Sequence, residues 1–377
     1  MTSLYIHVPF CLRKCPYCDF FSLPLNASQL EGFPQLVIAH LEQERHRDRW
    51  QGPFSTVFFG GGTPSLLPPR AVGLILQHAD RLFGLSRDAE ISLEANPGTV
   101  TAGKLLGYHG AGINRLSFGV QSLNDRNLAR LGRIHSAAEA RLAFRWARQA
   151  GFDNVGCDLI FALPDQTPQG ALADLESILQ LGPEHLSCYG LGIEPETPFA
   201  CQVEAGHMQP ATEEVYAESF MLLHERLIAA GFAHYEISNY GRTGRQCLHN
   251  LLTWKRQAYL GVGPGAHSFC DRQWGWRGMV PADLTSYRDA LAAHRDPVVE
   301  LETFDRRGAM AETAYLALRC AEGIDEAAFL RRFGIGFAEA FPVAVKRCGP
   351  HLICRQGRWR LDLQGWLLFD HFINPFL

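Results

Sequence analysis

Short apolar runs alternate with amphipathic stretches over the first two thirds of the chain. The apolar runs are nearly continuous, which is typical of strands that are buried on both faces. They are "SLYIHVP" (3–9), "TVFFGG" (56–61), "EISLEA" (90–95), "NRLSFGV" (114–120), "NVGCDLIFAL" (154–163) and "HLSCYGL" (185–191).

Amphipathic helical patterns separate these runs, at residues 71–83, 102–110, 137–150 and 170–181. Alternating strands and helices predict right-handed βαβ units and a parallel sheet, so the fold class is α/β. Six such units favour a (β/α)₆ barrel, closed or partial, over an open sheet. A helix near 212–230 and a strand near 233–240 continue the pattern.

The pattern changes twice in the last third of the chain. Residues 241 to about 281 are irregular and rich in Gly and aromatic residues. After residue 300 the sequence predicts two or three short helices, then a β-hairpin and a final helix. We therefore expect a barrel domain (1–240), an irregular connecting region (241–299) and a small winged-helix-like α+β domain (300–377).

Composition narrows the function classes. The 377 residues are 47% hydrophobic and 20% charged, with a net charge of −4, which argues against general nucleic-acid binding. No apolar run approaches the roughly 18 residues of a membrane span. The first nine residues lack the basic start and long apolar core of a signal peptide, so we expect a cytosolic protein.

The chain has eleven cysteines, which in a cytosolic protein do not normally form a disulfide framework. We interpret most of the singly placed ones as small buried hydrophobic residues. These are Cys157, Cys188, Cys201, Cys247, Cys270, Cys320, Cys348 and Cys354.

Cys11, Cys15 and Cys18 form the one constellation, in "FCLRKCPYCDFF" (10–21). A structural zinc site usually needs four ligands, and His7 is better interpreted as a packed strand residue than as the fourth. A 4Fe-4S cluster is normally held by four cysteines. Three cysteines leave one iron open to another ligand, so the triplet favours a cluster with one open coordination position.

The motif C-x₃-C-x₂-C, with Tyr17 directly before its last cysteine, resembles the signature of radical S-adenosylmethionine (SAM) proteins. Further phrases resemble the coproporphyrinogen-dehydrogenase-like branch and, within it, the HemW heme chaperones. They are "YIHVPFC", "CPYCDF", "FFGGGTPSLL", "EANPGT", "RLSFGVQS", "LGRIH", "DLIFALPDQT" and "GVGPGAHS", and they run nearly end to end.

The resemblance implies a partial (β/α)₆ radical SAM barrel with a HemN-type carboxyl-terminal domain. It also implies that the open iron chelates SAM, and that reduction through the cluster cleaves SAM to a 5′-deoxyadenosyl radical. The positions that match SAM contacts of the family are Tyr5, Tyr17, Gly61, Gly62, Thr63, Glu94, Gln121, Arg133 and Asp158.

Some of these residues have ordinary alternatives when they are considered without the resemblance. The Gly60–Gly62 run suits either a tight turn or a close backbone approach to a ligand. Glu94 and Asn96 stand where a strand ends, a place that suits a helix cap as well as the active face of a βα barrel.

Two departures separate this chain from the coproporphyrinogen dehydrogenases of the branch. Those enzymes carry a further cysteine two positions after the third, where this chain has Phe20. They also have an extra amino-terminal segment, whereas the cluster loop here begins at residue 11. Both departures argue against the decarboxylase activity.

A downstream phrase, "HNLLTW" (249–254), matches the heme-binding HNxxYW motif of the HemW proteins except that Thr253 replaces the tyrosine. His249, Asn250 and Trp254 are therefore candidate heme residues, with His249 a suitable axial ligand. The alternative is that His249 and Trp254 seal the barrel bottom or a domain junction. His267 is a second candidate that suits packing equally, and we expect His371 to be a surface helix residue.

Two functional classes remain open at this point. The first is a heme chaperone that uses the cluster and SAM structurally or for regulation. The second is a catalytic radical SAM enzyme of the same branch, such as a methyltransferase or a cyclopropane-forming enzyme. The implied partners are heme or another small molecule, heme-acceptor proteins and an electron donor, with a homodimer as a further expectation and no nucleic acid.

Overall fold

The computed structural model describes residues 1–47 and 49–377. Six parallel strands form its centre, and each corresponds to one of the six apolar runs of the sequence. They are β1 (Thr2–Val8), β4 (Phe54–Gly61), β5 (Leu85–Ala95), β6 (Arg115–Gln121), β7 (Val155–Phe161) and β8 (His185–Gly190). The largest boundary difference is at β5, which begins at Leu85 rather than at residue 90.

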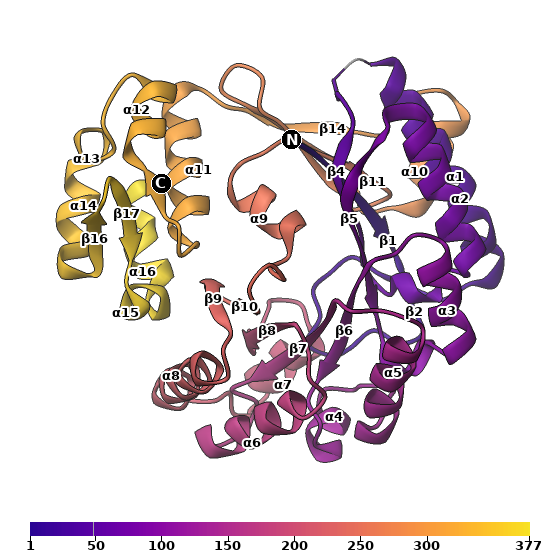
Figure 1. The fold of residues 1–377 in the computed structure, drawn as a ribbon, viewed down its shortest axis with the longest axis horizontal. Helices are drawn as coiled ribbons and strands as arrows, with labels where there is room; N and C mark the ends of the chain where they lie inside the picture. Colours follow the sequence, from indigo (N-terminus) through magenta and orange to yellow (C-terminus); the bar gives the residue numbers. More distant parts are fainter. Residues whose placement is uncertain (48) are drawn as a thin grey trace.

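Helices cover the outer side of these strands (Figure 1). They are α1 (Ala27–His46), α2 (Pro69–Phe83), α3 (Ala102–Gly110), α4 (Asp125–Arg130), α5 (Ala137–Gln149), α6 (Pro168–Leu179) and α8 (Glu213–Ala229). Helix α7 (Pro198–Glu204) instead contacts the cysteine loop, where Phe199 N donates to Pro16 O. In α2 the residues Ala71, Val72, Ile75, Leu76 and Ala79 are buried, a spacing of three and four that turns one helical face to the sheet.

The sheet is extended at both ends and does not close, so the barrel is partial, as predicted. On one side follow β10 (Asn239–Gly241) and β9 (Ala233–Glu236). On the other side follow β11 (Tyr259–Val262), β12 (His267–Cys270), β13 (Trp276–Met279) and β14 (Val299–Thr303). The strand order is β14-β13-β12-β11-β1-β4-β5-β6-β7-β8-β10-β9, with β14 and β9 at the edges.

Residues 241–299, which the sequence predicts to be irregular, hold regular structure. Besides β11–β13 they contain α9 (Leu248–Trp254) and α10 (Leu284–Ala292). The strands are short and interrupted by glycines, so they give little periodic signal. Gly261 is required by packing, since a Cβ atom there would lie 1.9 Å from the carbonyl oxygen of His267. The domain boundaries themselves stay a prediction.

Helix α1 is the largest element that the hydrophobic pattern does not predict. It packs beside α2 and α10. Its buried face includes Pro34, His40 and Glu44, which break the apolar stripe. Both polar side chains have partners, because His40 lies 3.2 Å from the Tyr287 hydroxyl and Glu44 accepts a 2.7 Å hydrogen bond from the Trp50 indole. These hydrogen bonds therefore add to the apolar burial of Phe33, Val37 and Leu41 on this face.

The carboxyl-terminal part, which lies wholly within the described residues, has the predicted order of helices, a hairpin and a helical end, but four helices precede the hairpin, where two or three were expected, and two follow it. Its helices are α11 (Arg306–Leu318), α12 (Glu326–Phe333), α13 (Phe337–Ala340), α14 (Pro342–Cys348), α15 (Leu363–Leu367) and α16 (Phe369–Ile373). Its strands β15 (Ile324–Asp325), β17 (Arg358–Leu361) and β16 (Leu352–Arg355) form a separate small sheet. Helix α9 contacts both β4 and α11, so it lies between the barrel and this domain (Figure 1).

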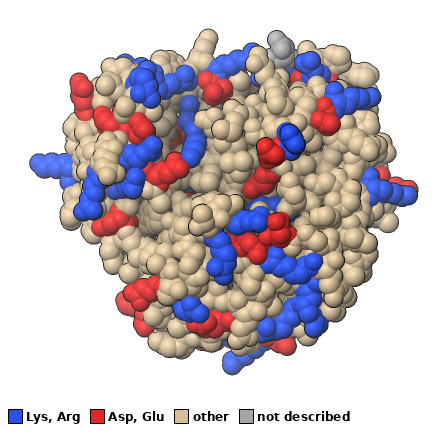
Figure 2. Space-filling model, viewed as in Figure 1, with Lys and Arg blue, Asp and Glu red and all other residues tan. Residues whose placement is uncertain are grey.

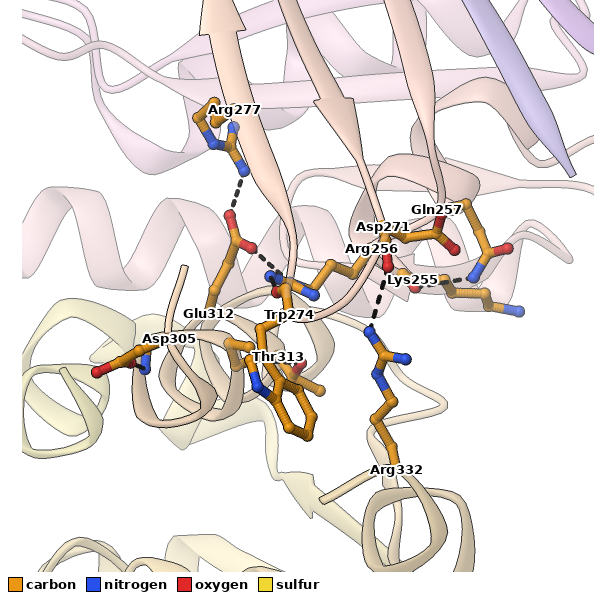
Figure 3. A network of polar contacts seen from close by, with 12 residues as sticks. Lys255, Arg256, Gln257, Asp271, Trp274, Arg277, Asp305, Glu312, Thr313 and Arg332 are labelled. Carbon is orange, nitrogen blue, oxygen red and sulfur yellow. Dashed lines mark hydrogen bonds and ion pairs between the residues drawn. The ribbon is translucent and has the colours of Figure 1, made fainter. Parts of the chain in front are cut away.

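A charged cluster fixes α11 to the connecting region (Figure 3). Glu312 of α11 binds Arg256, which follows α9, and Arg277 of β13. The Arg256 and Glu312 side chains are only 8% and 13% exposed. The Arg256 guanidinium also lies over the rings of Phe269 and Phe304, at 4.6 and 5.0 Å. This buried ion pair therefore lies within the apolar contact between α11 and the connecting region.

The surface agrees with the composition. On the face in Figure 2, basic and acidic side chains are interspersed rather than gathered by sign. Of the helices in the described part of the chain, none combines the length and the apolar character that crossing a bilayer requires.

We predict that Glu312→Ala lowers the free energy of unfolding by about 3 kcal/mol, because it leaves the buried Arg256 guanidinium without its carboxylate. Urea denaturation followed by circular dichroism measures the loss. The matched control is Glu322→Ala, which removes the partner of Lys255 in an exposed pair; we expect this change to cost at most about 1 kcal/mol. Equal losses in the two variants would contradict the role given to Glu312.

Candidate functional site

A cavity of about 430 Å³ opens at the carboxyl ends of the central parallel strands. Because these ends meet on one face, side chains from distant parts of the sequence converge there. Of the predicted site residues, those that line the cavity are Cys11, Cys15, Tyr17, Cys18, Gly61, Gly62, Thr63, Glu94, Gln121, Arg133 and Asp158.

The cysteine loop follows β1 and is held at both ends by backbone pairing. The short strands β2 (Phe10–Cys11) and β3 (Leu23–Pro24) lie parallel, with Leu23 N donating to Pro9 O and Leu25 N to Cys11 O. Within the loop, Cys18 N donates to Cys15 O and forms a tight turn. The backbone thus presents all three thiols to one cavity.

Two side chains donate hydrogen bonds to the sulfurs. The Thr63 hydroxyl lies 3.4 Å from Cys11 Sγ, and the Arg133 guanidinium lies 3.4 Å from Cys15 Sγ. Donors of this kind stabilise thiolate ligands and tune an iron–sulfur centre. Burial raises the pKa of the Cys18 thiol, which disfavours its free thiolate.

The arrangement of the triplet is compatible with a cluster. The three cysteines lie in one short loop, and all three line the cavity. In an iron–sulfur cluster each cysteine binds a different iron, so the sulfurs need not converge on one point. His7 is accounted for as predicted, since it is buried and its Nε2 lies 2.9 Å from Phe21 O.

The glycine run at the end of β4 is required by close packing against β1 and the cysteine loop. A Cβ atom on Gly61 would lie 2.8 Å from the His7 ring, and one on Gly62 would lie 2.8 Å from Phe10 O. Gly61 also has a φ of +106°, which favours glycine. These residues therefore bring backbone groups to the cavity wall where no side chain fits.

Two carboxylates face the cavity from deep within the barrel. Burial, and then the nearby Asp158, raise the pKa of Glu94 to about 8. Burial also raises the pKa of Asp158, against opposing hydrogen bonds from Ser187 and Ser117 and the charge of Arg115. Glu94 is therefore largely protonated at neutral pH, and a cation bound in the cavity would favour its ionised form.

Gln121 and Arg133 each keep an unused polar atom beside the cavity. Gln121 ends β6 with a φ of +67°, and its buried Oε1 has no hydrogen-bond partner in residues 1–47 and 49–377. Arg133 donates to Gly119 O at 2.7 Å, yet within the same ranges its Nε has no partner either. Unpaired buried polar atoms are uncommon, and two of them at one wall fit a site that receives a polar ligand.

Tyr5 does not line the cavity, unlike the other predicted SAM residues. Its hydroxyl lies 3.2 Å from His7 Nδ1, and its ring packs against Phe58 and His249. It therefore stands beneath the glycine run, where a Cβ on Gly60 would lie 2.9 Å from its ring. Tyr17 does line the cavity, and its ring lies 6.2 Å from that of Phe199.

His249 lies inside the barrel, on the face of α9 that is turned toward β4. The residue is 6% exposed, and its Nδ1 lies 2.8 Å from the Thr56 hydroxyl. The Glu90 carboxylate accepts hydrogen bonds from the backbone N–H groups of Leu248 and His249, both at 3.0 Å. Burial, followed by the charge of Arg115, lowers the pKa of His249 to about 3, so its imidazole is neutral.

Trp254 lies on the other side of α9. It comes five positions after His249, so the two side chains are about 140° apart around the helix axis. The Arg319 guanidinium lies 4.7 Å from the Trp254 ring, at the contact with the carboxyl-terminal domain. Asn250, which directly follows His249, is half-buried. His267 is exposed on β12 and does not line the cavity.

The cavity has further wall residues that the sequence motifs do not single out. Arg13 and Lys14 come from the cysteine loop, and Tyr189, Leu191 and Glu194 come from β8 and the loop after it. Tyr189 and Leu191 could have been found from the sequence, because they end the predicted strand at 185–191. The carboxyl end of that strand must reach the same face of the barrel as those of the other parallel strands. Glu194 follows in an irregular loop that gives no such signal.

The remaining cysteines largely follow the prediction. Cys157, Cys188, Cys247, Cys270, Cys320 and Cys348 are buried, whereas Cys201 and Cys354 are exposed. His371 is exposed on α16, as predicted for a surface helix residue.

Comparison with known proteins places the chain among characterised sequences. The family model of the radical SAM superfamily matches residues 5–178, and that of the HemN carboxyl-terminal domain matches residues 304–368. The chain is 42% identical over 272 residues to the heme chaperone HemW of Haemophilus influenzae, covering 70% of this chain and 69% of that protein. It is 33% identical to HemW of Bacillus subtilis, covering 100% and 99%.

Among solved structures, coproporphyrinogen III oxidase (HemN) from Escherichia coli has the same fold. The TM-score is 0.83 at 21% identity, with 100% of this chain and 89% of that chain covered. At this identity the likeness concerns the fold alone.

We predict that the affinity for SAM, whose sulfonium is cationic, rises with pH up to about 8. Below that pH, binding must first remove the proton from Glu94, so the affinity falls by up to tenfold for each pH unit. Calorimetric titration between pH 6 and 8.5 measures the slope. SAM has a titrating amine of its own, so Glu94→Gln is the control, and the difference between the two slopes isolates the carboxyl. Identical slopes would show that Glu94 does not titrate with binding.

Proposed function

The chain belongs to the HemW heme chaperone family of radical SAM proteins, and from this membership we propose that it binds heme and passes it to acceptor proteins. The observation that carries the proposal is His249, the histidine of the HNxxxW motif. Its imidazole is neutral, and Nδ1 is held by Thr56, which leaves Nε2 as the nitrogen for iron. Neutral imidazole is the form that binds a metal.

The radical SAM family is defined by a 4Fe-4S cluster with SAM. In our proposal Cys11, Cys15 and Cys18 hold the cluster, while Gly61, Gly62, Thr63, Glu94, Gln121, Arg133 and Asp158 surround SAM, with Tyr5 and Tyr17 as supporting aromatics. When bound, the cluster supplies the single electron that cleaves SAM to a 5′-deoxyadenosyl radical in this family.

The protein's own residues supply binding and charge. Thr63 and Arg133 orient two of the cysteine sulfurs through their hydrogen bonds. Glu94 and Asp158 offer two carboxyl groups to a cationic ligand, and Glu94 releases its proton as the cation binds. Gln121 Oε1, which has no partner in the described protein, accepts a hydrogen bond from the ligand.

Heme binding through His249 requires a change at α9. The imidazole is enclosed by Thr56, Phe58 and Tyr5 on the barrel side. Thr253 stands where the motif has a tyrosine, so His249 is the residue of the motif that we propose as the iron ligand. Asn250 and Trp254, in the same helix, would move with it.

The alternative is a catalytic radical SAM enzyme of the same branch. One feature of the cavity favours this enzyme alternative. Glu94, Asp158 and Tyr189 all line the cavity, and each carries a group that can hold a proton. An electron donor and a second copy of the chain are further proposed partners. Production of 5′-deoxyadenosine coupled to a modified substrate would favour this alternative.

We predict that anaerobically reconstituted protein contains about four irons per chain with the absorbance of an iron–sulfur cluster. Cys18→Ala should lose most of this iron, because one of three cluster ligands is removed. Cys201→Ala, which changes an exposed cysteine on α7, should keep it. One zinc per chain without iron would overturn the cluster assignment.

We predict that heme titration of the wild-type chain gives a Soret band that weakens and shifts in His249→Ala, since the iron loses its imidazole. His267→Ala, the matched change at an exposed histidine, should leave the spectrum unaltered. If the His267 variant alone changes the spectrum, His267 replaces His249 as the proposed ligand. If the wild type shows no Soret band at all, the heme chaperone proposal fails.

A further inference from the structure

The contact between α9 and the carboxyl-terminal domain holds a group of side chains whose buried polar atoms are incompletely paired within the described part of the chain. We call it the α9–α11 junction and define it by Glu236, Asn239, Trp254 and Arg319. Glu236 and Asn239 come from β9 and β10, Trp254 ends α9, and Arg319 directly follows α11. The backbone of Glu236 also forms a bridge to Cys320, so the barrel edge and the domain meet here.

Each of these four side chains has one buried polar atom without a hydrogen-bond partner among the described residues. The atoms are Glu236 Oε2, Asn239 Oδ1, Trp254 Nε1 and Arg319 Nε. Leaving one such atom unpaired costs about 1–3 kcal/mol. Four in one place indicate a site that is completed by water or by a polar group of a ligand.

Arg319 is not satisfied by the one carboxylate near it. Its Nη2 lies 3.9 Å from Glu236 Oε2, beyond hydrogen-bond distance. The other oxygen of Glu236 is held by the Asn239 amide and by Ser238 N. Burial raises the pKa of Glu236, which weakens its charge as a partner for Arg319.

The guanidinium is nevertheless held in place. It lies 4.7 Å from the Trp254 ring and 5.4 Å from the Phe369 ring, and the Arg319 side chain is 20% exposed. Stacking of this kind orients arginine for bidentate binding of a carboxylate. Glu236 and Asn239, by contrast, are 0% and 3% exposed. Of the two charged side chains only Arg319 therefore reaches the surface, while its Nε and Trp254 Nε1 are buried.

From this arrangement we propose that the α9–α11 junction binds a carboxylate of the ligand, with Arg319 as its ion-pair partner and Trp254 Nε1 as a second donor. The inference rests on the proposed function, because heme carries two propionate carboxylates. It assigns to the carboxyl-terminal domain a direct contact with the ligand. Arg319 and His249 lie on different sides of α9, so both engage one heme only after α9 turns.

The test compares heme with heme dimethyl ester, in which both carboxylates are blocked, by Soret titration in the same detergent buffer. We expect Arg319→Gln to bind heme about tenfold more weakly than the wild type, which corresponds to one lost charge-assisted hydrogen bond. The same variant should bind the ester as the wild type does. Arg319→Lys, which restores the charge, should recover part of the heme affinity.

Arg332→Gln is the matched control. Arg332 also stacks on a tryptophan, with its guanidinium 5.5 Å from the Trp274 ring, and it donates to the Asp271 carbonyl (Figure 3). Because it lies outside the α9–α11 junction, we expect it to leave both affinities unchanged.

Two results would overturn the inference while leaving the proposed function intact. In the first, Arg319→Gln weakens heme and the ester equally, which would show a purely structural role. In the second, it changes neither affinity while His249→Ala still alters the Soret band. Absence of heme binding by the wild type would instead remove the proposed function together with the inference.

Discussion

The interior of this partial barrel depends on one buried cation, Arg115 on β6. Burial opposes its charge, but Cys247, Glu90 and further neighbours outweigh that cost and raise its pKa above the usual value. Its charge opposes the rise in the pKa of Asp158 on the cavity side. On the other side burial lowers the pKa of His249 and of His185, and the charge of Arg115 lowers both further. One guanidinium thus acts on both the cavity carboxylates and the imidazoles around α9.

Helix α9 is the element through which the barrel and the carboxyl-terminal domain meet. Glu90 binds its first backbone N–H groups, and Thr56 holds His249 against the inner wall. Its far end is held by Arg319, stacked on Trp254. The motif is therefore divided between two environments, one sealed and neutral and one polar and incompletely paired. A ligand that uses both must change how the helix lies between them.

Much of the fold followed from the chain itself. Strands β1 and β4–β8 are continuous apolar runs that belong to a parallel sheet, and helix α3 spans the predicted residues. The three cysteine thiols line one cavity because they are close together in a single loop, which the sequence spacing alone indicates. Helix α1 escaped prediction because His40 and Glu44 lie on its buried face. The strands of residues 259–279 escaped because they are short and rich in glycine.

The sequence by itself determined which candidate site residues follow which strand. It also determined that the three cysteines share one loop. Only the tertiary structure decided what each of them faces. Tyr5, predicted beside SAM, lies beneath the glycine run, where its ring packs against Phe58 and His249 instead of lining the cavity. His249 and Trp254 stand five residues apart in one short motif, yet they point to different parts of the molecule. Spacing along a chain fixes local geometry, whereas burial and partners depend on which distant segments pack around it.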